Sequence, residues 1–120
     1  MIKKDNVVQL KSEQFALRIV RCYQFLITSK QERVLSKQLL RAGTSIGANV
    51  TEAEYAQSVS DFYSKMQIAL KEAAESRYWI ELLYQGKYLD KEQYSSLLDD
   101  VRGIINILVK ISKSRKTKEL

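Results

Sequence analysis

Hydrophobic residues recur every three or four positions along nearly the whole chain, and no proline interrupts them. This spacing places apolar side chains on one face of an α-helix, whereas a half-buried strand would need strict alternation. With only four glycines in 120 residues, the chain also lacks the turn residues that are typical of all-β folds. We therefore predict an all-α protein.

Local signals give the bounds of the first two helices. The apolar pattern predicts the first over about residues 12–27. The second is expected to begin after Ser29, because Ser29 and Glu32 have the spacing of a capping box. Its pattern ends near residue 57.

The third and fourth helices have equally clear ends. The third is expected to start at residues 58–60, where the segment Ser58 to Asp61 supplies cap residues. It is expected to end before Gly86, which we expect in the left-handed conformation that follows many helices. Asp90 is expected to cap the fourth helix, with Gln93 at its third position, and the apolar pattern runs to residue 111.

The connections between these segments are only a few residues long, so consecutive helices must fold back antiparallel. The sequence therefore predicts an antiparallel up-down-up-down four-helix bundle, in which residues 1–120 form a single domain. The last stretch, residues 112–120, is polar and basic, and we expect it to fray.

Missing residue types limit the chemistry. The chain has no histidine, which excludes Ser-His-Asp machinery and histidine-ligated metals. Its one cysteine, Cys22, can form neither an internal disulfide nor a thiolate cluster. We expect no enzyme activity, no cofactor and no metal. The polar start and the lack of 18 consecutive apolar residues predict a cytoplasmic protein without a membrane span.

Positive charge gathers at the two ends of the chain. Lys and Arg number 20 against 14 Asp and Glu, for a net charge of +6. An up-down bundle brings the start of the first helix and the end of the fourth to the same pole. Such a cluster would suit a nucleic-acid backbone, although cations also favour helix C-termini and keep proteins soluble. The candidate nucleic-acid-binding residues are Lys3, Lys4, Lys11, Arg18, Arg21, Arg102, Lys110, Lys113, Arg115, Lys116 and Lys118.

Two glycines lie inside the second predicted helix, where each costs about 1 kcal/mol relative to alanine. Gly43 and Gly47 are four residues apart and share one face. Small residues on one face allow a neighbouring helix to come close. We interpret them as packing residues, because a phosphate-binding loop would need a preceding strand and a Lys-Ser/Thr pair.

A polar residue, Asn49, interrupts the apolar seam of the second helix. A buried asparagine needs hydrogen-bond partners, and polar side chains on the third helix lie within reach. We predict a structural cluster that fixes helix register, with a carboxylate metal site or an acid/base pair as the alternative. The cluster comprises Ser45, Asn49, Glu52, Glu72 and Glu75.

The third helix is apolar around most of its circumference near Tyr78, Trp79 and Leu82. A bundle helix normally keeps one face in water. Tryptophan and tyrosine are enriched at subunit interfaces. These three residues are therefore the candidate oligomer interface, unless the aromatic rings simply lie flat on the surface.

Two segments, LLRAGTSIGANVTEA at 39–53 and ALKEAAESRYW at 69–79, resemble a bacterial family of four-helix bundles. Some of its members are encoded by intervening sequences in 23S ribosomal RNA genes. The accessory variability determinant of diversity-generating retroelements is similar. The resemblance extends over about residues 15–111. The matching motif positions, which read as packing and register residues, are Gly43, Ser45, Gly47, Asn49, Glu52 and Glu75.

The resemblance implies a four-helix bundle in a ring-shaped homo-oligomer, most simply a pentamer, with basic surfaces that contact RNA or DNA. It implies a reverse-transcriptase partner for the retroelement relatives, and it brings no catalytic residues. Three hypotheses follow. The chain is a non-catalytic oligomeric nucleic-acid-binding protein, a protein-interaction scaffold, or an enzyme or metal carrier that uses Glu52, Glu72 and Glu75.

Overall fold

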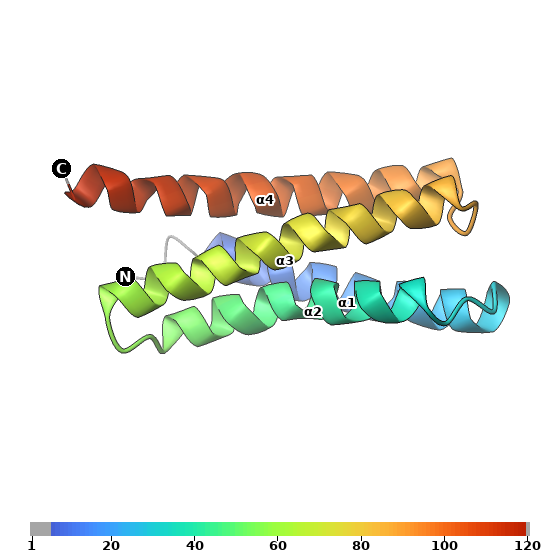
Figure 1. Ribbon diagram of the computed structural model, residues 1–120, viewed down its shortest axis with the longest axis horizontal. Coiled ribbons are helices and arrows are strands. Elements are labelled where there is room, and N and C mark those ends of the chain that lie inside the picture. The colour runs from blue at the N-terminus through green and yellow to red at the C-terminus, as the bar shows by residue number, and fades with distance from the viewer. Residues whose placement is uncertain (1–5, 120) are drawn as a thin grey trace.

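The computed structural model describes residues 6–119, and the side chains of residues 7–115. Four helices account for nearly all of them and run alternately up and down (Figure 1). They form an elongated body of about 49 × 21 × 21 Å. The predicted all-α four-helix bundle is confirmed. The helices are α1 (Asn6–Ser29), α2 (Leu35–Glu54), α3 (Val59–Gln85) and α4 (Lys91–Glu119).

Each helix buries one stripe of side chains whose spacing alternates between three and four residues. In α1 the fully buried positions include Val8, Ser12, Phe15, Ile19 and Leu26. The stripes of the other helices meet this one in a single core. None of the described helices has an apolar stretch of the length needed to cross a membrane.

The start of α2 differs from the prediction, because Ser29 is the last residue of α1 and caps nothing. Glu32 caps the helix instead. Its carboxylate accepts hydrogen bonds from the backbone N–H groups of Val34 (3.0 Å), Leu35 (2.9 Å) and Ser36 (2.7 Å). Burial raises the pKa of the Glu32 carboxyl, but these hydrogen bonds outweigh burial and hold the pKa below its usual range. The carboxylate thus satisfies three of the donors that every helix start leaves open.

The predicted caps of α3 and α4 are confirmed. The Ser58 hydroxyl accepts from the Asp61 N–H at 3.0 Å. Asp90 and Gln93 form a reciprocal capping box, with the Gln93 N–H donating to Asp90 Oδ1 at 2.7 Å and the Asp90 N–H donating to Gln93 Oε1 at 2.9 Å.

The turn between these helices shifts the left-handed position by one residue from the prediction. Gly86 has φ of −77°, and Lys87 has φ of 69°. The Tyr88 N–H bonds the Leu83 carbonyl, and the Lys87 N–H bonds the Tyr84 carbonyl. This is the Schellman pattern, with lysine in the place that usually holds glycine.

Besides the start of α2, three predicted helix bounds are wrong, and the end of α4 is the most important of them. This helix continues to Glu119 where we expected a frayed tail from residue 112. Side chains of its last turns contact α3, which gives them partners that a free tail would lack. In addition, α1 starts six residues earlier than predicted, at Asn6, and α2 ends at Glu54 rather than near 57.

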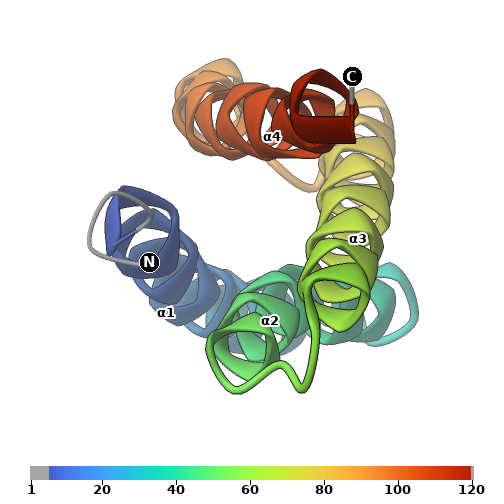
Figure 2. The ribbon, with the colours of Figure 1, turned by 90° about the vertical axis from the view of Figure 1, so that its left-hand side faces the viewer.

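The four helices surround the core in chain order, but the first and the last pack against each other only weakly. Contacts between α1 and α4 are far fewer than those between any two consecutive helices. Seen along the axis, α1 and α4 stand apart at the open side of the arrangement (Figure 2). The start of α1 and the end of α4 lie at the same end of the bundle, as predicted (Figure 1).

Gly43 and Gly47 face α1, and both are buried. A Cβ atom on Gly43 would lie 2.9 Å from two carbons of Ile19, whereas one on Gly47 would lie 3.5 Å from the Ser12 carbonyl oxygen. The expected close approach of a neighbouring helix is therefore confirmed, and it is tightest at Gly43. Gly103 in α4 has no such neighbour within 4 Å.

We predict that Gly43→Ala destabilises the fold by about 1–3 kcal/mol, because the new methyl group overlaps the branched carbons of Ile19 in the core. Gly103→Ala is the matched control. It should stabilise the fold by about 0.5–1 kcal/mol, since alanine favours a helix where space is open. Urea unfolding of both variants measures the difference. Equal effects of the two substitutions would contradict this account of the α1–α2 contact.

Candidate nucleic-acid interface

A groove of about 570 Å³ lies between α3 and the last turns of α4. Its floor combines apolar side chains with hydroxyl and amide groups, and two cations stand beside them. None of the lining residues whose side chains the structure describes is acidic. The groove is lined by Tyr63, Ser64, Gln67, Leu70, Val109, Ser112, Lys113 and Arg115.

Hydrogen bonds between the two helices hold the walls of this groove. The Tyr63 hydroxyl lies 3.0 Å from Ser114 Oγ, and Ser112 Oγ donates to Gln67 Oε1 at 2.9 Å. The Arg115 guanidinium lies over the Tyr63 ring, 5.5 Å from its centre, within the range of a cation–π contact. Tyr63 and Gln67 were not among the predicted residues, because only the α3–α4 register brings them to the basic end.

The basic residues predicted at the chain ends divide into those with described side chains and those without. Lys110 and Lys113 are exposed on the last turns of α4, and in the described part of the chain no carboxylate lies within ion-pair distance of either. Lys3 and Lys4 fall outside the described residues. The backbones of Lys116 and Lys118 belong to α4, but their side chains lie outside the description.

Two of the basic residues of α1, Lys11 and Arg18, face acidic neighbours that were not predicted. Arg18 forms an ion pair with Asp100 on α4 at 2.5 Å. Lys11 lines a small cleft together with Asp99 and Asp100. Arg21 is exposed at the rim of another groove. The charge of Arg18 is thus largely compensated, so this part of the predicted basic surface is weaker than its sequence suggests.

Arg102 does not join the α1 arginines, contrary to expectation. Two residues along an α-helix correspond to a rotation of about 200°. Because Asp100 faces Arg18, Arg102 must project from the opposite side of α4. The predicted single patch therefore splits between the α1–α4 side and the outer α3–α4 side.

A second groove of about 330 Å³ lies between α1 and α4, lined by Arg18, Arg21, Cys22, Phe25, Leu89, Gln93 and Leu97. Burial raises the pKa of the Cys22 thiol to about 11, against a smaller lowering by Arg18. The thiol therefore stays protonated at neutral pH. A protonated thiol is a poor nucleophile and a poor metal ligand.

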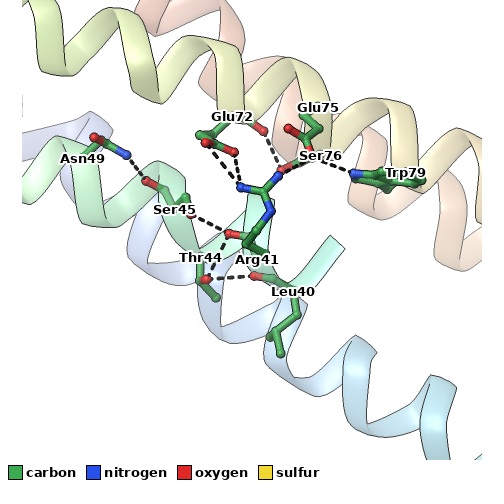
Figure 3. A network of polar contacts seen from close by, with 9 residues as sticks. All are labelled: Leu40, Arg41, Thr44, Ser45, Asn49, Glu72, Glu75, Ser76 and Trp79. Atoms are coloured by element: carbon green, nitrogen blue, oxygen red, sulfur yellow. Dashed lines mark hydrogen bonds and ion pairs between the residues drawn. The ribbon is translucent and has the colours of Figure 1, made fainter. Parts of the chain in front are cut away.

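A polar cluster joins α2 to α3, but Arg41 rather than Asn49 is at its centre (Figure 3). Arg41 donates to Glu72 Oε1 at 3.2 Å and also pairs with Glu75. Glu75 Oε2 accepts from the Trp79 indole N–H at 3.0 Å. Both predicted glutamates belong to this cluster, whereas the arginine that connects them to α2 was not predicted.

The remaining predicted members do not bridge the helices. Ser45 Oγ donates to the Arg41 carbonyl at 2.6 Å, and Asn49 Nδ2 donates to the Ser45 carbonyl at 2.9 Å, so both bonds stay within α2 (Figure 3). Asn49 is only half-buried. Glu52 pairs with Lys65 at 3.0 Å, away from the other glutamates. Among the described residues no three Asp, Glu or Cys side chains gather as metal ligands.

A family model described as 23S rRNA-intervening sequence protein matches residues 4–110. The chain belongs to this family. A solved structure similar to this member, from Bacteroides thetaiotaomicron, is described as a protein of unknown function from the S23 ribosomal protein family. It shares 55% identity, with a TM-score of 0.90 over 92% of this chain and 98% of its own. The search of curated proteins found no match.

Three aromatic and apolar positions of this 23S rRNA-intervening sequence family member were predicted as an oligomer interface. Tyr78 is 55% exposed, whereas Trp79 and Leu82 are half-buried. The rings of Tyr78 and Trp79 meet edge to face, with their centres 4.9 Å apart. Of these three residues, Tyr78 thus offers the most exposed side chain to a partner, while Trp79 donates a hydrogen bond to Glu75.

We predict that lowering the pH reduces the free energy of unfolding of this family member, in part through protonation of Glu75. Hydrogen bonds from Trp79 and Arg41 hold the pKa of Glu75 below its usual range. The stabilisation is therefore present above the unfolded-state pKa of about 4.3 and is lost as the pH falls through the lower folded-state value. Glu75→Gln should cost about 0.5–1 kcal/mol at pH 7 and much less at pH 3.

Urea unfolding at both pH values measures this difference. Glu13→Gln is the control, because it removes an exposed carboxylate of α1 that has no ion-pair partner among the described residues. An identical cost of Glu75→Gln at pH 7 and pH 3 would show that the contacts of Glu75 do not depend on its charge.

Proposed function

We propose that this protein is a non-catalytic, oligomeric nucleic-acid-binding bundle, and that its basic end contacts the phosphate backbone. The contacts assigned to this role are Lys110, Lys113 and Arg115. The α3–α4 groove carries the proposal, because Lys113 and Arg115 stand there beside hydroxyl and amide groups that can also bind a phosphate backbone.

The distribution of charge supports this choice of surface. Lys11 and Arg18 of α1 lie near Asp99 and Asp100, whereas the later turns of α4 present Lys110 and Lys113 without a described acidic partner. A phosphate backbone binds where such cations release its counterions. Lys3, Lys4, Lys116 and Lys118 carry further positive charge in the chain ends beyond the described side chains.

Assembly would multiply this charge. The resemblance implies a ring-shaped homo-oligomer, and we propose a pentamer with Tyr78 at the subunit contact. Several weak phosphate sites on one ring would bind one strand together, and linked sites gain affinity without any new contact. A net charge of +6 for each subunit suits this mode of binding.

The alternative is a protein-interaction scaffold with no direct nucleic-acid role. The exposed ring of Tyr78 favours it, because large exposed aromatic side chains mark protein interfaces. The similarity to retroelement accessory proteins would make a reverse transcriptase one such partner. In this alternative the Tyr78 surface binds a different protein, and the basic end serves solubility.

We predict that Lys110→Ala/Lys113→Ala weakens binding to labelled RNA and duplex DNA. Each lost phosphate contact lowers the slope of log K against log salt by about 0.7–0.9, so the double variant should lose up to about 1.4–1.8. Fluorescence anisotropy between 50 and 200 mM salt measures the slope.

Lys37→Ala/Lys91→Ala is the matched control for this experiment. It removes the same charge from exposed lysines at the starts of α2 and α4, at the other end of the bundle (Figure 1). Equal losses in both double variants would show that net charge alone matters and would remove the site assignment. A wild-type protein that binds neither nucleic acid at low salt would favour the scaffold.

We predict that Tyr78→Lys shifts the oligomer toward smaller species, since a charge replaces an exposed aromatic ring at the subunit contact. Light scattering after size exclusion measures the molar mass. Tyr55→Lys is the control, because Tyr55 is 83% exposed just beyond the end of α2. A Tyr78→Lys protein that keeps the wild-type mass would place the subunit contact elsewhere.

A further inference from the structure

The α3–α4 groove is a recess rather than a flat charged surface. Leu70 and Val109 contribute apolar carbon to its lining, while Gln67, Ser112 and Lys113 contribute polar groups. Its volume of about 570 Å³ lies within the range of pockets that enclose small organic ligands, roughly 300–1,000 Å³. A site that only contacts a phosphate group would need neither a recess of this volume nor the apolar side chains that line it.

A planar group borders this recess. The Arg115 guanidinium lies over the Tyr63 ring and also lines the groove. Unstacked nucleobases pack against arginine planes and aromatic rings in single-stranded nucleic-acid complexes. A base against Arg115 would continue the stack that Tyr63 begins.

Hydrogen-bonding groups in the recess suit the edge of a base. Gln67 Oε1 already accepts from Ser112 Oγ at 2.9 Å. Gln67 is exposed, and the same amide group also has two N–H donors. Every nucleobase has hydrogen-bond acceptors on its edge. Lys113 lies in the same groove and carries the charge for the attached phosphate.

We propose that the α3–α4 groove binds one unpaired nucleotide of a single-stranded nucleic acid, with the base against Arg115 and Gln67 and the phosphate at Lys113. This inference rests on the proposed function and narrows its substrate class. Bases inside a duplex are stacked and paired, so they cannot enter a recess between two helices, and the protein should prefer unpaired strands.

The test compares a labelled 12-nucleotide RNA strand and the same DNA strand with their duplexes, at near-physiological salt, with the full-length protein. The wild type should bind the single strands more tightly. Arg115→Lys keeps the charge and removes the plane, so it should weaken single-strand binding about 5- to 10-fold and change duplex binding less than about twofold. Gln67→Ala should weaken only single-strand binding. The strand, RNA or DNA, whose single-stranded form binds more tightly relative to its duplex is the preferred ligand.

Arg102→Lys is the control, because Arg102 is exposed on the same helix and does not line the groove. Equal salt-sensitive binding to single strands and duplexes, or equal losses for both in Arg115→Lys, would overturn the nucleotide pocket and leave the proposed phosphate binding intact. Absence of binding to every strand, at low salt as well, would overturn both.

Discussion

One apolar stripe on each helix, with spacing that alternates between three and four residues, holds the bundle together. The stripes of all four helices meet in a single core that contains the large buried side chains Phe15, Ile46, Met66 and Leu108. Because this arrangement uses only one side of each helix, the remaining surfaces are free to carry charge. The candidate sites therefore lie on the outside, in the furrows between helices, rather than inside the core.

The candidate groove depends on the register of α3 against α4 rather than on any local motif. Tyr63 and Ser114 are 51 positions apart in the sequence and touch only because the two helices pair antiparallel. The Lys87 turn and the Asp90–Gln93 capping box fix that pairing at the opposite end. A register shift of one residue would rotate the lining of α4 by about 100° and would separate Lys113 from Gln67.

Much of this architecture could be predicted from the sequence, because helix period and capping are local properties. The caps Ser58 and Asp90 were identified from their neighbours alone. Both Ser29 and Glu32 have side chains that can cap the start of α2. Glu32 is the cap because α1 continues through Ser29. The arginine that joins the helices could not be found, since Arg41 reaches Glu72 and Glu75 only through tertiary packing. The end of α4 was missed for the same reason.

The sparse seam between α1 and α4 has a consequence for how the chain folds. Strong contacts join only helices that follow one another, so the fold is a succession of three helical hairpins. Each hairpin closes a loop of a few residues, which costs little entropy. Folding therefore depends little on contacts between α1 and α4, and contacts between helices adjacent in the chain favour rapid folding. Helices can add one after another, in the order in which a ribosome releases them.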